Sequence, residues 1–291
     1  MAQTLVCFHA HPDDEALLTA GVMAAAAAAG HRVVLVVATR GEVGMVAGDF
    51  LAEGETLADR RWQELARSAL ELGVRRLEWL GYGDSGSGNR TDPPGDPTGD
   101  PGDRTDPEES GPAQPFAQAD VETAAEQLAE ILKEEHADVL TTYDPNGGYG
   151  HPDHLQVHRV GARAGELAGT PIVLEATINR DLIRMGAELA GSLGFELPPE
   201  LTPDSFDNWY TPADELTHAV DVRTHLAAKR ASMEAHASQA TGGDAGFSRS
   251  FTSFLSLPPD AFELAFGTEF FVDRDRPAGI AATDIFEPRP S

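Results

Sequence analysis

The chain has 291 residues, which is enough for one large α/β domain or two smaller ones. Hydrophobic residues make up 41% of it, so the chain can bury a sizeable core and is not a disordered protein. Its 48 acidic residues outnumber its 21 basic residues and give a formal net charge of −27. Such a surface repels phosphate backbones and anionic membranes, which excludes nucleic-acid binding through a basic patch.

The single cysteine, Cys7, excludes an internal disulfide framework and is typical of a reducing compartment. The first residues lack the basic region and cleavage site of a signal peptide. The longest weakly polar run, residues 16–29, is too short to span a bilayer. We therefore expect a cytoplasmic protein without a membrane partner. The sequence leaves the oligomeric state open, a homo-oligomer included.

Strand and helix patterns alternate along most of the chain. In order, they predict a strand at 5–8, a helix at 14–29, a strand at 33–38, a helix at 57–72, a strand at 75–80, a helix at 121–135, a strand at 138–143, a helix at 152–168, a strand at 172–176, a helix at 179–193, a strand at 218–222 and a helix at 222–238. Repeated strand–helix–strand units predict a Rossmann-like α/β fold, with a mostly parallel sheet flanked by helices. The last part of the chain gives no clear pattern.

Residues 83–119 interrupt this alternation. They contain seven prolines and seven glycines but no leucine, isoleucine or valine. Such a composition cannot bury enough apolar surface to offset its ordering entropy, so it predicts an extended, flexible surface insertion. A lid over a binding site, beginning at Asp84, is the alternative. We expect one domain, residues 1–291, that carries this insertion.

Two segments rich in histidine and aspartate follow predicted strands. Residues 8–15 read Phe-His-Ala-His-Pro-Asp-Asp-Glu, and residues 147–154 read Gly-Gly-Tyr-Gly-His-Pro-Asp-His. Ligands of open parallel sheets bind outside the carboxyl ends of the strands, so both segments are expected to converge on one metal ion. Imidazole and carboxylate ligands suit zinc and are tolerated by iron, cobalt or nickel. Three such ligands leave a position for water, which is typical of a hydrolytic site.

A simpler explanation exists for residues 12–15 taken alone. Pro12 suits the first position of a helix, and the acidic residues that follow would complement the helix dipole. The second histidine-rich segment favours the metal site instead. A nucleotide-binding module is disfavoured, because the first strand is not followed by the Gly-x-Gly-x-x-Gly phosphate loop.

Residues 10–15 (Ala-His-Pro-Asp-Asp-Glu) and 151–154 (His-Pro-Asp-His) resemble the two signature motifs of the LmbE-like, PIG-L-type N-acetylglucosaminyl deacetylases. The similarity extends over about residues 3–160. That family hydrolyses N-acyl groups, usually acetyl groups of glucosamine derivatives, with a divalent metal on a Rossmann-like fold. The resemblance implies one Zn²⁺ per chain, or another divalent ion such as Fe²⁺. It implies His11, Asp14 and His154 as the metal ligands and Asp13 as the general base.

Other polar residues of the two segments are expected to assist the reaction. His151 is a candidate cation facing the developing oxyanion, and Tyr149 a hydrogen-bond donor to the tetrahedral intermediate. Asp153 is expected to orient or charge-tune an imidazole. His158, one turn further along the predicted helix, is expected to be a neighbour rather than a ligand. His9 is expected to belong to the core or to support the ligands.

Four residues are predicted to contact the substrate. Glu42 ends a Thr-Arg-Gly-Glu segment that resembles the family's Thr-x-Gly-Glu, and Arg61 matches a position that the family uses near substrate. A solvated helix face is the alternative for Arg61. Asp84 follows the third strand and is placed to bond sugar hydroxyls. His236 lies in a Lys-x6-His-x-Ser-Gln segment that resembles a C-terminal family motif, which suggests a place at the site rim.

The predicted function is hydrolysis of the N-acetyl group of an N-acetylglucosamine-containing small molecule, with metal-bound water as nucleophile and Asp13 as general base. Residues 144–151 look more like the mycothiol-pathway deacetylases of N-acetylglucosaminyl-inositol than like the mycothiol-conjugate amidases. Amidase action on a thiol conjugate or an antibiotic intermediate stays an alternative. A metal-binding protein without catalysis is a second one, although the presence of Asp13 weighs against it.

Overall fold

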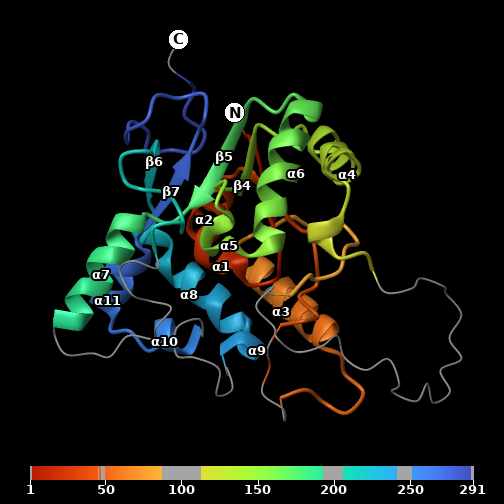
Figure 1. The fold of residues 1–291 in the computed structure, drawn as a ribbon, viewed down its shortest axis with the longest axis horizontal. Coiled ribbons are helices and arrows are strands. Elements are labelled where there is room, and N and C mark those ends of the chain that lie inside the picture. Colours follow the sequence, from red (N-terminus) through yellow and green to blue (C-terminus); the bar gives the residue numbers. More distant parts are fainter. Residues whose placement is uncertain are drawn as a thin grey trace, which may run out of the picture.

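The computed structural model describes residues 2–44, 46, 50–86, 113–192, 206–240 and 251–289. A seven-stranded sheet in the order β3-β2-β1-β4-β5-β7-β6 forms its centre (Figure 1). The first five strands in this order run parallel, and β7 pairs antiparallel with both β5 and β6. The strands are β1 (Thr4–His9), β2 (Arg32–Val37), β3 (Arg76–Trp79), β4 (Val139–Tyr143), β5 (Ile172–Thr177), β6 (His218–Asp221) and β7 (Thr268–Val272). The predicted Rossmann-like, mostly parallel sheet is confirmed.

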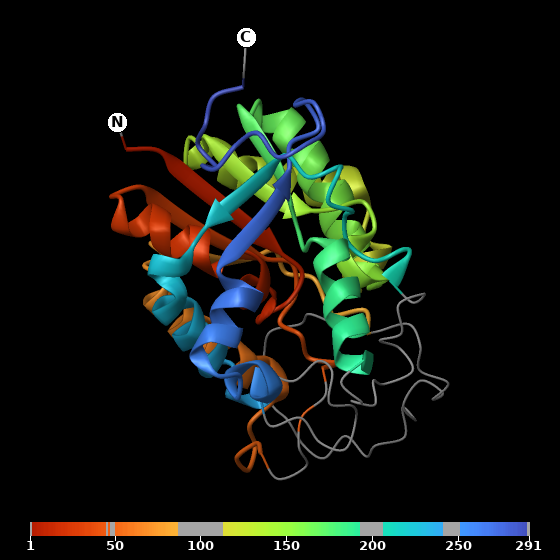
Figure 2. The ribbon, with the colours of Figure 1, turned by 90° about the vertical axis from the view of Figure 1, so that its left-hand side faces the viewer.

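Helices cover both faces of this sheet, as Figure 2 shows. On one face α4 packs against α6, and on the other α2 and α3 pack against α8. The helices are α1 (Asp14–Leu18), α2 (Ala20–Ala28), α3 (Leu57–Glu71), α4 (Val121–Glu134), α5 (Gly147–Gly150), α6 (Pro152–Ala168), α7 (Arg180–Ser192), α8 (Leu226–Ala235), α9 (Ala237–Ala240), α10 (Phe251–Leu255) and α11 (Pro259–Phe266), with the 3-10 turns η1 (Phe116–Gln118) and η4 (Arg223–His225). None of the helices within the described ranges combines the length and apolar character that a bilayer crossing demands.

The central strands β1, β2 and β4 carry almost unbroken runs of buried side chains. Parallel strands with helices on both faces read as continuous apolar runs rather than as an alternating pattern. This is why the sequence identified these strands to within one or two residues. Their common direction brings the carboxyl ends of β1 and β4, which are direct neighbours, to the same edge of the sheet.

The helix expected at residues 14–29 is divided into α1 and α2 by Thr19, whose backbone (φ −137°, ψ 0°) is not helical. The Thr19 hydroxyl hydrogen-bonds to His9 Nε2 at 2.8 Å. Glu269, from strand β7, accepts hydrogen bonds from the amides of Gly21 and Val22 at 2.7 and 2.8 Å and so caps α2. The expectation of one continuous helix was wrong because a distant carboxylate supplies the second helix start. Asp13 caps α1, so Pro12 precedes the cap and is not the first helical residue.

The C-terminal third departs further from expectation. The helix expected at residues 222–238 consists of η4, α8 and α9, and His236 (φ −85°, ψ 54°) separates α8 from α9. Strand β7, which the sequence did not predict, lies between β5 and β6 and extends the sheet. Its pairing with β5 joins the C-terminal third to the parallel part of the sheet.

Both ends of the proline- and glycine-rich segment are packed against the fold. Gly83 forms a bridge with Pro115, and Phe116 is fully buried against Phe8 and Tyr82. Residues 87–112 of the expected insertion lie outside the described residues. The described flanks therefore belong to the body of the fold, at the carboxyl end of β3.

Candidate active site

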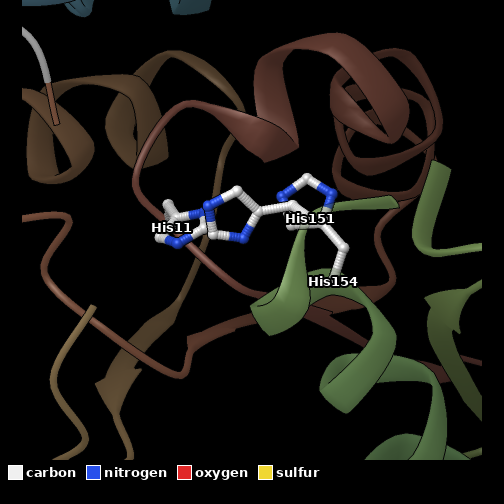
Figure 3. Close-up of side chains that lie close together, drawn as sticks. All are labelled: His11, His151 and His154. Atoms are coloured by element: carbon white, nitrogen blue, oxygen red, sulfur yellow. The ribbon is translucent and has the colours of Figure 1, made fainter. Parts of the chain in front are cut away.

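Two chain segments far apart in sequence meet at the carboxyl ends of β1 and β4. His11 follows β1, whereas His151 and His154 lie at the start of α6 (Figure 3). The ring centroids are 4.8 Å apart for His11 and His151, 5.4 Å for His11 and His154, and 5.1 Å for His151 and His154. The ligand atoms of the three lie within 4.8 Å of one another, close enough to hold one metal ion. The convergence expected from the sequence is confirmed.

Asp14 lies between two of these imidazoles. Its Oδ2 is 3.4 Å from His11 Nδ1, and its Oδ1 is 3.4 Å from His154 Nε2. His154 Nε2 is buried and has no hydrogen-bond partner among the residues that the structure describes. A buried polar atom without a partner is costly, and a lone pair on that nitrogen would be satisfied by a cation. The residues His11, Asp14 and His154 therefore fit a divalent metal.

A carboxylate behind His11 fixes the orientation of its ring. His11 Nε2 lies 3.1 Å from Asp153 Oδ2. Asp153 also accepts hydrogen bonds from the amide and hydroxyl of Ser85 and from the amide of Ala117. In the neutral form that could bind a metal, the ring carries its proton on Nε2 and its lone pair on Nδ1, on the side of Asp14. Such a carboxylate–histidine pair is the usual support of a metal-ligating imidazole.

A second group of possible ligands consists of His11, Asp84, His151 and Asp153. Its atoms are already used within the protein, because Asp153 accepts four hydrogen bonds and Asp84 Oδ1 accepts one from the amide of Gly86 at 2.8 Å. This group orients side chains rather than offering an unused ligand set.

The electrostatics of the site favour a positive charge. Burial opposes protonation of His11, but the hydrogen bonds to Asp14, Asp153 and Asp84 outweigh burial and raise its pKa well above the usual range. Burial likewise opposes ionisation of Asp14, yet His154 and His11 hold the pKa of Asp14 well below its usual range. A site that stabilises an imidazolium among carboxylates also suits a cation.

Asp13 turns away from Asp14 and contacts Arg61. Its backbone has φ 114° and ψ −27°, which is uncommon for a residue with a side chain and costs on the order of 1–3 kcal/mol. Glu15 Oε2 accepts from the amide of Asp13 at 3.0 Å, and Arg61 Nη2 donates to Asp13 Oδ2 at 2.9 Å. Burial raises the pKa of Asp13 to about 6, with Arg61 opposing it. A carboxylate with such a pKa is suited to accept a proton near neutral pH.

Arg61 is buried, with 4% of its surface exposed, although it lies in the middle of the polar-looking helix α3. It also donates to the carbonyls of Pro12 (2.5 Å) and Gly41 (2.9 Å). A Cβ at Gly41, whose φ is +67°, would overlap the guanidinium. The solvated helix face considered for Arg61 is therefore wrong. The side chain holds Asp13 in place, and its predicted contact with substrate stays a prediction.

His151 caps helix α6, and its Nδ1 accepts from the amide of Asp153 at 3.2 Å. This places the proton of a neutral ring on Nε2. Burial, together with the charges of His11 and His154, lowers the pKa of His151 to about 4. The expectation of a cationic His151 thus conflicts with its surroundings, which favour a neutral hydrogen-bond donor. Tyr149 stands beside it, with ring centroids 6.2 Å apart.

A family model described as "PIG-L: GlcNAc-PI de-N-acetylase" matches residues 6–165, more than half of the chain. The chain belongs to the PIG-L family. A "1D-myo-inositol 2-acetamido-2-deoxy-alpha-D-glucopyranoside deacetylase" of Thermomonospora curvata is 35% identical, covering 95% of this chain and 92% of its own. The residues discussed above as metal ligands and base all lie inside the matched segment.

Solved structures share the fold at low sequence identity. An N,N'-diacetylchitobiose deacetylase from Pyrococcus horikoshii superposes with a TM-score of 0.54 at 19% identity, covering 94% of this chain and 84% of that one. A 4-carboxy-2-hydroxymuconate hydratase from Pseudomonas putida has a TM-score of 0.54 at 14% identity, covering 94% and 96%. Because the two names denote different reactions, this likeness concerns the fold, and the function of the PIG-L chain has to be argued from its site.

The loops after β2 and β3 meet beside His11 in this PIG-L chain. Glu42 Oε1 accepts from the amide of Asp84 at 2.8 Å, and Asp84 Oδ1 lies 3.5 Å from His11 Nε2. Asp84 is held ionised, because burial is outweighed by its contact with His11, which lowers its pKa. Contacts of Glu42 and Asp84 with a substrate stay predictions.

His236 is not at the rim of the site. Its side chain is fully buried and lies 2.5 Å from Glu15 Oε1. His9 is also fully buried, bonded to Tyr143 and Thr19, and His158 Nδ1 contacts the carbonyl of Tyr143. These positions agree with the expectation that His9 belongs to the core or supports the ligands and that His158 is a neighbour rather than a ligand.

From the sequence, Glu15 was expected only to complement a helix dipole, and Ser85 only to belong to a segment that bonds sugar hydroxyls, yet both bond residues of the site. Glu15 bonds the amide of Asp13, and Ser85 bonds Asp153. Glu15 ends the first motif, and that position was a signal for a role in the site. The position of Ser85 next to Asp84 offered a weaker signal of the same kind.

A small cavity adjoins Asp14 and His154. Its volume is about 30 Å³, and Asp14, His154 and Tyr149 line it together with Leu17, Leu18 and Ala176. A cavity of about 10–15 Å³, measured in the same way, is enough to hold one water molecule, so this one has room for a small group. Its largely apolar wall suits a methyl group next to the proposed metal position.

Proposed function

We propose that this protein is a metal-dependent hydrolase that removes the acetyl group from an N-acetylglucosamine-containing small molecule. The observation that carries the proposal is the position of Asp14 between His11 and the unpartnered Nε2 of His154, beside the separately held carboxylate of Asp13. The names of the relatives support deacetylation as the reaction. As substrate we propose 1D-myo-inositol 2-acetamido-2-deoxy-α-D-glucopyranoside.

His11, Asp14 and His154 would hold the ion, for which we propose Zn²⁺, with Fe²⁺ as an alternative of similar ligand preference. A divalent cation bound there would acidify water and polarise the amide carbonyl. Asp13 takes the proton of the attacking water and delivers it to the departing amine, so that the C–N bond is replaced by a C–O bond and acetate leaves. The Nε2–H of His151 and the hydroxyl of Tyr149 donate hydrogen bonds to the developing oxyanion.

Several features favour an uncharged acetamido sugar. The small cavity beside Asp14 and His154, with its largely apolar wall, has room for the methyl group of an acetyl group. Asp84 and Glu42 offer acceptors for hydroxyl groups near the ligands, and Arg61 is the third predicted sugar contact. A neutral substrate is not repelled by a surface with a net charge of −27.

The test combines metal analysis with an acetate-release assay on the inositol glycoside and on free N-acetylglucosamine. Asp13→Asn should retain the metal and lose about 10²- to 10⁴-fold in kcat, the usual effect of losing a general base. His154→Ala should lose the metal. His158→Ala is the matched control on the same helix, since His158 contacts the carbonyl of Tyr143 and not the ligands, and it should keep both metal and activity.

Four results would contradict the proposal. Turnover that persists after chelation would exclude a metal mechanism. Full activity of Asp13→Asn would exclude Asp13 as the base. Release of amine from a thiol conjugate but not from either acetamido sugar would favour the amidase alternative, and bound metal without any turnover would favour a binding protein.

We propose further that residues 1–291 form one domain and act in the cytoplasm. The pairing of β7 with β5 supports the first statement, because it joins the C-terminal third to the sheet that carries the site. The lone Cys7, fully buried and unpaired, supports a reducing compartment. Size-exclusion chromatography with light scattering would give the oligomeric state.

A further inference from the structure

A buried ionisable pair lies behind the proposed base. Glu15, in α1, and His236, between α8 and α9, are both 0% exposed, and Glu15 Oε1 is 2.5 Å from His236 Nε2. The two residues are 221 positions apart in the sequence. Neither side chain reaches the surface, so neither touches a substrate, and a role in the reaction has to act through another residue.

The second oxygen of Glu15 supplies that link. Glu15 Oε2 accepts from the amide of Asp13 at 3.0 Å, and Ser68, on α3, donates to Oε1 at 2.6 Å. The amide of Asp13 belongs to the residue with φ 114°, a conformation that persists only where the surroundings hold it. This conformation sends the Asp13 carboxylate toward Arg61 while Asp14 faces the imidazoles.

The same C-terminal segment also braces the helix that carries Arg61. The amide and hydroxyl of Ser238 donate to the two carboxylate oxygens of Glu64 at 2.9 and 2.6 Å. Glu64 lies on α3, one turn after Arg61, and is fully buried. The main chain of Asp13 and its side-chain partner are thus both tied to residues 236–238.

We propose that His236 is a positioning residue for the general base. By bonding Glu15, it fixes the carboxylate that holds the amide of Asp13 and thereby aims the Asp13 side chain. The proposal rests on the proposed function, in which Asp13 is the base. It gives a part in the reaction to a segment that lies outside the match to the family model, which ends at residue 165.

A purely structural pair serves as the comparison. Lys229 and Glu269 are as deeply buried, with side-chain exposures of 1% and 2%, and they fix the start of α2 rather than Asp13. Glu269→Gln is therefore the matched control for His236→Ala. Both changes should lower the thermal stability, and only the change at His236 should affect the geometry of the base.

The kinetic test compares His236→Ala, His236→Gln and Glu269→Gln at a temperature at which all are folded. His236→Ala should lower kcat about 10- to 100-fold, the usual effect of removing a residue that orients catalytic groups, with KM and bound metal unchanged. His236→Gln, whose amide nitrogen can donate to Glu15, should recover most of this loss. Glu269→Gln should keep the wild-type kcat.

A second readout does not depend on activity. Hydrogen exchange at the amide of Asp13, followed by NMR, should accelerate on the order of tenfold in His236→Ala and stay unchanged in Glu269→Gln. Wild-type kcat and wild-type exchange in His236→Ala would overturn the proposal. So would equal losses of kcat in His236→Ala and Glu269→Gln. The proposed function fails separately, if Asp13→Asn keeps full activity or the wild type releases no acetate.

Discussion

Replacing Lys229 by methionine should destabilise the fold strongly, because it removes the cation from a carboxylate that is out of contact with water. Lys229 Nζ donates to Glu269 Oε1 at 2.6 Å and to the carbonyl of Leu17 at 2.7 Å. Only 1% of the lysine side chain and 2% of the glutamate side chain are exposed. Methionine has a similar length, so the packing is largely kept, and the main loss is electrostatic.

The magnitude follows from the burial. Removing one partner of a buried ion pair costs about 3–5 kcal/mol, since it leaves an uncompensated charge. The amides of Gly21 and Val22 still donate to Glu269 at the start of α2, which favours the lower end of this range. For a chain of this size, each kcal/mol lowers Tm by about 2 °C, so Tm should fall by about 6–10 °C.

The assay is thermal and urea unfolding of the single variants and of the double variant Lys229→Met/Glu269→Gln. The double variant should be less destabilised than the sum of the singles by about 1–3 kcal/mol, because it contains no unpaired charge. Glu122→Gln, which removes the exposed pair with Arg163, is the control and should leave Tm nearly unchanged. A loss in Lys229→Met no larger than in this control would refute the reasoning.

Four further predictions concern the site and the core. Since protonation removes the base, kcat/KM should fall as the pH drops through the pKa of Asp13, at about pH 6 or lower once a cation lies nearby, as a pH–rate profile would show. The raised pKa of His11 means that metal binding at pH 7 should release about one proton, measurable by calorimetry in buffers of different ionisation enthalpy; no release would contradict His11 as a ligand. Gly41→Ala should displace Arg61 and lower kcat more than tenfold with the metal retained, whereas wild-type kinetics would show that the clamp is dispensable. Burial raises the pKa of Cys7 to about 12, so a thiol reagent should modify it only after unfolding, and rapid labelling of the native protein would contradict its burial.

Those parts of the fold that depend on local pattern could be predicted from the sequence. The apolar runs of β1, β2 and β4 mark strands buried on both faces, and the helix α6 begins and ends where Pro152 and Gly169 predict. The two motifs were sufficient to place His11 and His154 together, because adjacent parallel strands end at the same edge. The predictions from the sequence agree with the structure wherever the position of a residue depends on a single strand end or helix start.

The features that could not be predicted depend on contacts between distant segments. Residues 14–29 have a continuous helical pattern, and the carboxylate of Glu269 and the bond between Thr19 and His9 divide it. His236 looked like a residue at the site rim, because neither spacing nor composition shows which carboxylate a histidine meets 221 residues away. Strand β7 was missed for the same reason, since its pairing with β5 and β6 is not encoded locally.

Several of these contacts between distant segments share one feature: a residue of the C-terminal helices bonds a buried carboxylate. The residues that would bind the metal and the substrate come from the segments that follow β1, β2, β3 and β4, whereas His236, between α8 and α9, and Ser238, in α9, each reach inward to a buried carboxylate. The backbone of Asp13, at φ 114°, needs such support from distant residues, because the local sequence does not stabilise this conformation. The Thermomonospora curvata deacetylase aligns over 95% of this chain and therefore extends well beyond residue 165, as expected if the C-terminal helices are part of the catalytic unit.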